Sequence, residues 1–429
     1  MSSSVVPLDP KVNPGFLKLD LYCRGLRLHE SCTVEDDGGR PVMRARAGLG
    51  SGLELILDPG LYVNVPVVES FAAESPYELR RTADGKYDLW HDGSPCVRVR
   101  LSPRPDWYDA LTSTGKAMRR IGTLQGTYLA VYPAQVCHFW VQGEQRPARE
   151  NCRFCTVGLN LGVDEEHGKS VDEVLEVVHA ARRESAITYV DFNTGHYDGS
   201  EFLDVLQPYV ERVKRETGLL VGVQTPPFAH EPDYARLRAL GVNRVSFCFE
   251  VFDPEVFREL CPGKARVYGL QGYLQAISTC TALAPKKRFT LDPWVVNGEL
   301  IAGLEPTESS LAALDWLTER GAIPTVCVFR PLKGTQLEDH PPPSTEDMVP
   351  VFAALWDRCM EHRLPIGVAP NIHVSLVMLP EECRWLVQDE AVLKRHRMQG
   401  RRLAAMRTVF GPAFKAGLRL RRRPAPTGS

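Results

Sequence analysis

From about residue 125 onward, the sequence repeats one unit, an apolar strand-like run followed by an amphipathic helical stretch. The strand-like runs cover residues 127–134, 186–195, 218–227, 241–253, 287–296 and 322–335, with 365–371 as a further candidate. The helical stretches cover residues 169–184, 200–215, 232–239, 254–260, 267–283, 307–320 and 345–362. This alternation predicts βαβ units and a parallel sheet. Repeated this often, the units are expected to close into a partial or complete (β/α) barrel of the TIM type, an α/β fold.

The residues before these repeats have a different texture. Short alternating runs such as GLELILDPGLYVNVPVV, residues 52–68, are broken by Gly, Pro and Asp, a pattern typical of antiparallel strands. A helical segment near 107–120 is expected to lead into the repeats. We therefore predict three parts, which are a smaller β-rich N-terminal domain (1–110), the barrel (111–375) and a helical, basic C-terminal extension (376–429).

The overall composition excludes several classes of protein. Among 429 residues, 44% are hydrophobic and the net charge is −2, which argues against a nucleic-acid binder or a membrane-surface protein. No run approaches the length of a spanning helix, and the N-terminal MSSSVVPLDPKVNPG lacks the pattern of a signal peptide. The expected compartment is therefore the cytoplasm, where cysteine thiols are kept reduced.

Three of the twelve cysteines, Cys137, Cys152 and Cys155, fall within the nineteen residues CHFWVQGEQRPARENCRFC. They follow the first strand of the repeats, and the functional groups of such barrels lie at the carboxyl ends of the strands. A cluster of reduced thiols indicates metal or redox chemistry. Cysteine thiolates hold iron–sulfur clusters, but with His138 the same thiols could form a structural Cys3His zinc site.

Polar residues on the strands predict a lined interior. On the fourth strand, Ser246, Cys248 and Glu250 alternate with apolar residues, so that one face is polar and the other packs against helices. An inward carboxylate at Glu250 needs a partner or a ligand. Gln224 and Arg330, near the ends of the third and sixth strands, are candidate substrate contacts. The structural alternatives are a satisfied interior amide for Gln224 and an ion pair for Glu250 or Arg330.

The cysteine loop and the barrel pattern together resemble the radical-SAM superfamily, in which a cluster and S-adenosylmethionine (SAM) act together. The commonest motif of that superfamily is C-x3-C-x2-C with an aromatic residue before the last cysteine. Here Phe154 precedes Cys155, but fourteen residues separate the first two thiols. The second strand ends in Asn193-Thr194-Gly195-His196, where the superfamily has a Gly-rich segment.

A narrower resemblance covers about residues 106 to 350. The segment FRPLKGTQLEDHPPPSTEDM is similar to the sixth-strand region of biotin-synthase-like proteins. The segments WYDALTSTGKAMRRIGTLQG, CRFCTVGLNL, VQTPP, FEVFDPEVFRELCPGKAR and FRPLKGT resemble uncharacterised radical-SAM proteins encoded in nitrilase gene clusters. The likeness lapses after residue 360, and the later Cys-rich segment of that family has no counterpart here.

The resemblance implies an enzyme with a [4Fe–4S] cluster and SAM as cofactors. One iron, left free by the three thiolates, would bind SAM, and reductive cleavage would give a 5′-deoxyadenosyl radical that abstracts hydrogen from a small organic substrate. Rearrangement, lysis, dehydrogenation or cyclisation would follow. The implied partner is a flavodoxin or ferredoxin that donates the electron.

The same resemblance assigns roles to individual residues. The implied cluster ligands are Cys137, Cys152 and Cys155. The implied cofactor contacts are Thr194 and Gly195 for the methionyl end of SAM, Glu250 for the ribose and the backbone around Phe154 for the adenine. The candidate substrate contacts are Asn193, Gln224 and Arg330.

Two other classes of function remain open at this stage. The first is a non-catalytic scaffold that zinc or a redox-passive cluster stabilises. The second is an RNA-modifying radical-SAM enzyme that uses the basic C-terminal residues, although a solvated helix face with a frayed tail is the favoured interpretation of these residues. A second cluster involving Cys248 and Cys261 is a further alternative.

Overall fold

The computed structural model describes residues 4–32, 52–133, 136–142, 148–199, 202–284 and 292–421. The N-terminal part contains α1 (Pro14–Arg24), β1 (Arg27–Leu28), β2 (Leu53–Leu57), β3 (Leu61–Val65), β4 (Tyr77–Arg81), β5 (Tyr87–His91) and β6 (Ser94–Leu101). These strands form one sheet in the order β1-β4-β5-β6-β2-β3. Every pair in it is antiparallel except β1 with β4. The N-terminal strands are therefore confirmed, whereas the helix α1 was not expected.

A second, seven-stranded sheet has the order β13-β12-β11-β10-β9-β8-β7. Its strands are β7 (Gly122–Gln125), β8 (Tyr128–Val131), β9 (Tyr189–Asn193), β10 (Leu220–Gln224), β11 (Arg244–Glu250), β12 (Val295–Ala302) and β13 (Ile323–Val328). The strands β8 to β13 run parallel, and β7 pairs antiparallel with β8. This is the expected α/β architecture of a partial (β/α) barrel.

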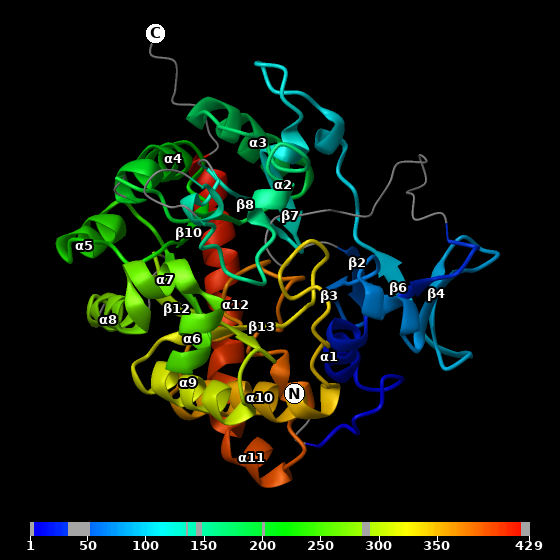
Figure 1. Ribbon diagram of the computed structural model, residues 1–429. Coiled ribbons are helices and arrows are strands. Elements are labelled where there is room, and N and C mark those ends of the chain that lie inside the picture. Colours follow the sequence, from blue (N-terminus) through cyan, green and yellow to red (C-terminus); the bar gives the residue numbers. More distant parts are fainter. Residues whose placement is uncertain are drawn as a thin grey trace.

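Helices follow the parallel strands, most of them where the periodicity predicts. They are α2 (Val157–Asn160), α3 (Val171–Glu184), α4 (Phe202–Thr217), α5 (Pro232–Ala239), α6 (Pro254–Leu260), α7 (Pro262–Val267), α8 (Gly269–Ala282), α9 (Thr307–Glu319) and α10 (Thr345–Glu361). The Ser170 hydroxyl accepts from the Glu173 amide, and the Glu173 carboxylate accepts from the Ser170 amide. This capping box fixes the start of α3. Figure 1 shows these helices around the outside of the parallel strands.

Three sequence-based expectations about elements are wrong or partly wrong. Residues 107–120 form the short 3-10 helices η2 (Asp106–Asp109) and η3 (Met118–Arg120) around a bridged turn, not one helix, because Gly115 adopts φ +85°. Residues 365–371 form no strand, since Pro365 and Pro370 and the positive φ of Gly367 interrupt pairing. The strand expected over 287–296 begins only at Val295, and residues 287–291 lie outside the described ranges.

The C-terminal residues close the barrel at the amino ends of its strands. Two aromatic residues of α12 (Arg397–Arg421), Phe410 and Phe414, pack against Tyr128, Tyr189 and Leu220, which stand at the starts of β8, β9 and β10. The helix α12 follows α11 (Glu390–Arg395) and runs beside the parallel strands in Figure 1. One end of the barrel is therefore covered by a segment that is distant in sequence.

The segment 371–375 joins the N-terminal sheet to the barrel. The amide of Thr127, in the β7–β8 turn, donates to the carbonyl of His373 (3.1 Å), and the amide of Asn64 in β3 donates to that of Ser375 (2.7 Å). The N-terminal sheet consequently lies beside the edge of the barrel (Figure 1). The boundaries 1–110, 111–375 and 376–429 stay a prediction.

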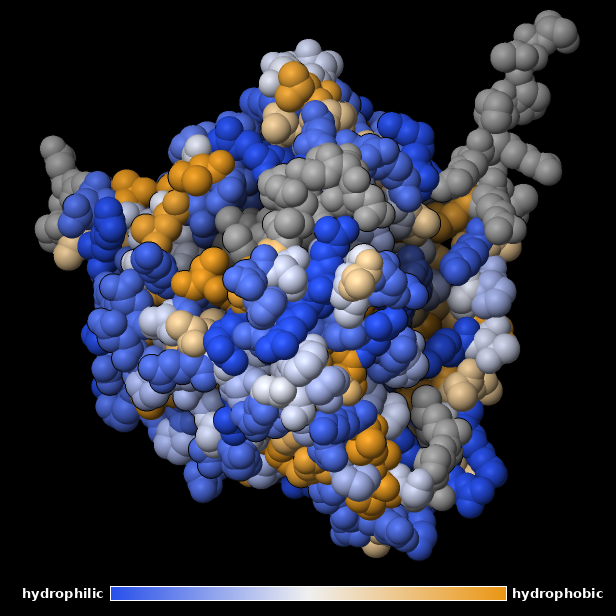
Figure 2. All heavy atoms as spheres, turned by 90° about the vertical axis from the view of Figure 1, so that its right-hand side faces the viewer, coloured by the Kyte–Doolittle hydropathy of each residue, from blue (hydrophilic) through white to orange (hydrophobic). Residues whose placement is uncertain are grey.

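No helix in the described ranges is both long enough and apolar enough to cross a membrane. On the face that carries the N-terminal sheet, hydrophilic residues predominate and apolar ones form separate small groups (Figure 2).

Candidate functional site

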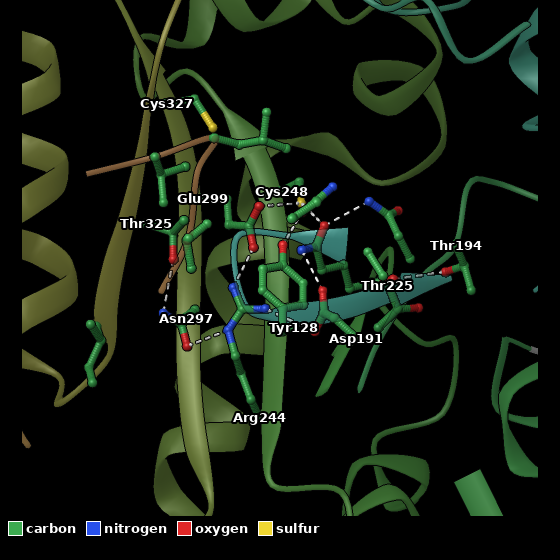
Figure 3. Close-up of a pocket in the computed structure, with 18 of the residues that line it drawn as sticks. Tyr128, Asp191, Thr194, Thr225, Arg244, Cys248, Asn297, Glu299, Thr325 and Cys327 are labelled. Carbon is green, nitrogen blue, oxygen red and sulfur yellow. Dashed lines mark hydrogen bonds and ion pairs between the residues drawn. The ribbon is translucent and has the colours of Figure 1, made fainter. Parts of the chain in front are cut away.

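A cavity of about 460 Å³ occupies the interior of the barrel. Figure 3 shows part of its lining. At one end it is bounded by the three cysteines of the loop 137–155 and by the strand-end residues 193–196. Polar residues of β9 to β13 form one wall, and residues 365–381 form another. The cysteines and strand-end residues predicted as the site therefore border the same cavity as residues 365–381. This segment includes residues 365–371, for which a strand was expected.

The three thiols lie together at the carboxyl end of the parallel sheet. Cys137, Cys152 and Cys155 all line the cavity. Burial raises the pKa of Cys137, and the nearby Cys152 raises it further. Burial also raises the pKa of Cys155 to about 12, and Cys152 and then Cys137 add to that shift. The three thiols therefore border the same end of the cavity, although fourteen residues separate the first two in sequence.

Backbone hydrogen bonds hold this loop against the turn between α6 and α7. The amide of Arg153 donates to the Leu260 carbonyl (2.9 Å), and the amide of Gly263 donates to that of Glu150 (3.0 Å). This pairing places the buried Cys261 beside Cys152, and the hydrogen bond between the two thiols lowers the pKa of Cys152. A fourth thiol therefore borders the cluster loop, a feature that the sequence spacing alone did not single out.

Gly195 lies directly against the first cysteine. A Cβ atom at this position would stand 2.5 Å from the Cβ of Cys137, 2.8 Å from its Cα and 2.6 Å from the Tyr132 hydroxyl oxygen. The next amide, that of His196, donates to the Cys137 sulfur (3.4 Å). The strand-end segment and the cysteine loop are thus in contact, and only glycine permits the approach.

We expect Gly195→Ala to lower the iron content of the reconstituted protein at least about twofold, because the new methyl group must displace the Cys137 backbone in a close-packed interior. The measurement is iron and sulfide per chain after anaerobic reconstitution. Gly272→Ala is the matched control, since a Cβ there meets nothing closer than 3.7 Å. An unchanged iron content in Gly195→Ala would contradict the expected displacement.

The other predicted cofactor contacts border the same cavity. Phe154, Thr194 and Glu250 line it together with Gly195. The Thr194 hydroxyl donates to the backbone carbonyl of Gln224 (3.1 Å), so its side chain is already engaged. Their roles toward SAM stay predictions.

Glu250 sits in an irregular backbone at the end of β11. Its φ is +73°, and the register against β12 shifts between Cys248 and Glu250. Its carboxylate pairs with Lys264 (2.6 Å), which also donates to the Cys248 carbonyl (2.7 Å). The ion pair expected as a structural alternative therefore exists, and it holds a carboxylate at the cavity wall beside the cysteine loop.

The three candidate substrate contacts do not come together. Asn193 and Gln224 line the cavity, and the Asn193 amide donates to the Gln224 side-chain oxygen (2.8 Å). Arg330 is not among the described residues that line it. Arg330 is 2% exposed, and its guanidinium donates to the side-chain and backbone oxygens of Asn64 in the N-terminal sheet. This position supports a structural role for Arg330, not contact with a substrate.

The side-chain positions give no support to the zinc alternative. The Nδ1 atom of His138 accepts from the Asp198 amide (2.8 Å), and His138 is not among the described residues that line the cavity with the three thiols. Within the described ranges, no three His, Cys, Asp or Glu side chains are placed to hold a single metal ion. The thiolates of a cubic cluster bind separate irons and do not converge on one point, so this observation leaves the cluster assignment open.

The donor set fits a [4Fe–4S] cluster. Three reduced thiols from one loop border one cavity, which is the chemistry that such clusters require of a protein. The alternative of a second cluster has no comparable group of thiols. Cys261 lies beside Cys152, whereas the Cys248 thiol donates to Glu299 (3.3 Å).

Sequence reasoning missed a buried charge network deeper in the cavity. Arg244 of β11 pairs with Asp191 of β9 (3.2 Å) and Glu299 of β12 (2.6 Å). Figure 3 shows Arg244 between the strands that carry the two carboxylates. The inward alternation of β11, extended back from Ser246 by two residues, would have found Arg244. Nothing local in the sequence links it to Asp191 and Glu299.

Comparisons with known proteins gave partial matches. No family model matches the chain. The bacteriochlorophyllide c C-7(1)-hydroxylase of Chlorobaculum limnaeum is 29% identical over 126 residues, which are 29% of this chain and 30% of that protein. The match therefore spans less than a third of the curated relative.

Three solved structures show likenesses with TM-scores below 0.5. Methylornithine synthase has a TM-score of 0.41 and 16% identity, over 68% of this chain and 90% of that one. A radical SAM methyltransferase from Sphaerobacter thermophilus has a TM-score of 0.37 and 15% identity, over 66% and 75% of the two chains. Coproporphyrinogen III oxidase from Escherichia coli, described as a radical SAM enzyme, has a TM-score of 0.33 and 14% identity, over 49% and 46%.

The chain resembles radical-SAM enzymes. The resemblance lies in the cysteine motif and in the partial barrel that carries it. The narrower likeness to the radical-SAM proteins of nitrilase gene clusters stays a prediction.

Proposed function

We propose that this protein is a radical-SAM enzyme that acts on a small organic substrate inside its barrel. The observation that carries the proposal is the meeting of three loop thiols with the 193–196 strand end at the mouth of one cavity. Functional groups of such barrels gather at the carboxyl ends of the strands. The alternative of a purely structural metal site would not need a cavity beyond the ligands.

In this proposal, Cys137, Cys152 and Cys155 hold the [4Fe–4S] cluster and leave one iron for SAM. When bound, cluster and SAM supply an electron and a cleavable carbon–sulfur bond, which together give a 5′-deoxyadenosyl radical. Thr194, Gly195, Glu250 and the backbone at Phe154 bind SAM. The flavodoxin or ferredoxin donor and the cytoplasmic location belong to the same proposal.

The chain's own contribution is to orient the reactants and to exclude water. The segment 365–381 covers one wall of the cavity, and α12 covers the amino ends of the strands. A closed interior protects a reactive carbon radical from side reactions. The pair of Glu250 and Lys264 keeps a carboxylate at the wall without an uncompensated charge.

Metal analysis and SAM cleavage test the proposal together. We expect protein purified and reconstituted without oxygen to contain about four irons and about four sulfides per chain, as a cubic cluster requires. After reduction with dithionite it should convert SAM to 5′-deoxyadenosine, measured by mass spectrometry. One zinc without sulfide would instead identify a structural site. A full cluster without SAM cleavage would indicate a redox-passive scaffold.

A further inference from the structure

The part of the cavity away from the cysteine loop carries more acidic than basic groups. Two carboxylates, Asp191 and Glu299, share the single guanidinium of Arg244. A lysine at the cavity wall, Lys264, pairs with Glu250 nearer the cysteine loop. Burial raises the pKa of Asp191, which Arg244 opposes. A buried negative charge without a full counter-charge costs free energy until a ligand supplies one.

One carboxylate oxygen in this network is left with a weak donor. Glu299 is 9% exposed and lines the cavity. Its Oε1 atom accepts from Arg244 (2.6 Å) and from the hydroxyl of Ser246. Its Oε2 atom accepts from the Cys248 thiol (3.3 Å). A thiol is a poor donor, and a carboxylate oxygen has capacity for stronger ones.

The oxygens of Asp191 are better supplied. Its Oδ1 atom accepts from Arg244 (3.2 Å) and from the hydroxyl of Tyr189, and its Oδ2 atom accepts from the Gln224 amide (2.8 Å). The two carboxylates therefore differ, because strong donors reach both oxygens of Asp191 but only one oxygen of Glu299. Of these two carboxylates, Glu299 is consequently the one whose Oε2 atom can accept a further, stronger donor.

Between residues 366 and 378 the wall formed by the C-terminal segment is apolar, and the carboxylate of Glu381 lines the cavity at the end of the same segment. The apolar lining side chains include Ile366, Val368, Ile372, Val374, Leu376 and Met378. The cavity thus has the carboxylate of Glu299 on one side and the hydrocarbon surface of residues 366–378 on another. Apolar lining with a small number of placed polar groups is the usual form of a small-molecule site.

We propose that this cavity binds a small, apolar organic amine whose positively charged ammonium group donates to Glu299 Oε2. The assignment of a substrate class rests on the proposed function, although amine binding itself does not require it. The ammonium supplies the missing positive charge, and the hydrocarbon body contacts the 366–378 wall. The size is limited because the cysteine end of the same 460 Å³ cavity is assigned to SAM.

The test uses three probes of the same shape but different charge, namely benzylamine, benzyl alcohol and benzoate. Their affinities for the anaerobically reconstituted full-length protein are measured by calorimetry or ligand-detected NMR. We expect benzylamine to bind about tenfold or more tightly than benzyl alcohol, and benzoate not to bind. Equal or tighter binding of the alcohol or of benzoate, or no binding of the amine at millimolar concentration, would overturn the proposal.

The variant Glu299→Gln removes the charge and keeps the shape. It should abolish the preference for benzylamine over benzyl alcohol, whereas Glu308→Gln, on the exposed face of α9, should retain it. Circular dichroism is used to check that both variants fold. If Glu299→Gln does not fold, the affinities of the three probes for the wild-type protein still test the proposal. A retained preference in folded Glu299→Gln would refute the role of Glu299.

The two proposals fail separately. Amine preference without a cluster or SAM cleavage would refute the radical-SAM proposal and leave the binding site in place. SAM cleavage without a preference for the amine would refute the amine site and leave the radical-SAM proposal in place.

Discussion

Alanine in place of Cys137, Cys152 or Cys155 is expected to abolish 5′-deoxyadenosine formation in each case. Each thiol supplies one of three protein ligands to the proposed cluster, and all three border the same end of the cavity. Losing one ligand leaves two irons without protein thiolates, so that the cluster is lost or cannot present SAM correctly. The measurements are iron and sulfide per chain and product formed by reduced enzyme.

Two other cysteines provide controls for these variants. Cys280 in α8 is buried outside the cavity, and Cys280→Ala should keep both iron and activity. Cys261 touches Cys152, and Cys261→Ala should keep its iron because Cys261 is a neighbour of the ligand set, not a member. If Cys261→Ala loses iron while Cys155→Ala retains it, the assignment of the three ligands is wrong.

Removal of the buried arginine is expected to give the largest loss of stability. Arg244→Met leaves Asp191 and Glu299 without their shared cation, at positions where their side chains are 3% and 11% exposed. Breaking a buried ion pair on one side costs about 3–5 kcal/mol, and water in the cavity should place the loss near the lower end. The measurement is the free energy of unfolding in denaturant, supported by Tm.

The loss in Arg244→Met should depend on pH. Burial already raises the pKa of Asp191 above its usual value, and Arg244 opposes that rise. Without Arg244 the pKa of Asp191 moves further up. A carboxyl whose pKa is raised by folding destabilises the folded state increasingly as pH rises from its unfolded pKa to the raised value. The variant should therefore be more destabilised at pH 8 than at pH 5.

Arg212 offers a matched control on the surface. It also pairs with two carboxylates, those of Asp172 (3.1 Å) and Glu216 (2.6 Å), but in solvent. Exposed pairs contribute little to stability, so Arg212→Met should change unfolding hardly at all. An equal loss in the two variants would show that the buried position of Arg244 has no special importance.

The sequence by itself determined the alternation of strands and helices and the place of the thiols. The periodicity of the residues from 127 to 361 is a local property, and it located most of the parallel strands and their helices. The same local logic put the cysteines after a strand and turned Glu250 inward, at the end of β11. These features follow from residue spacing because each depends on neighbours a few positions away.

The tertiary structure alone decided which distant residues meet. Asp191, Arg244 and Glu299 come together because β9 to β12 pair in a particular register, which no local pattern specifies. Local breaks also overrode the expected strand at 365–371, and long-range packing made that segment an apolar wall of the cavity. Periodicity records which way a side chain points on its own element, whereas a binding site requires several elements to place their side chains in the same volume.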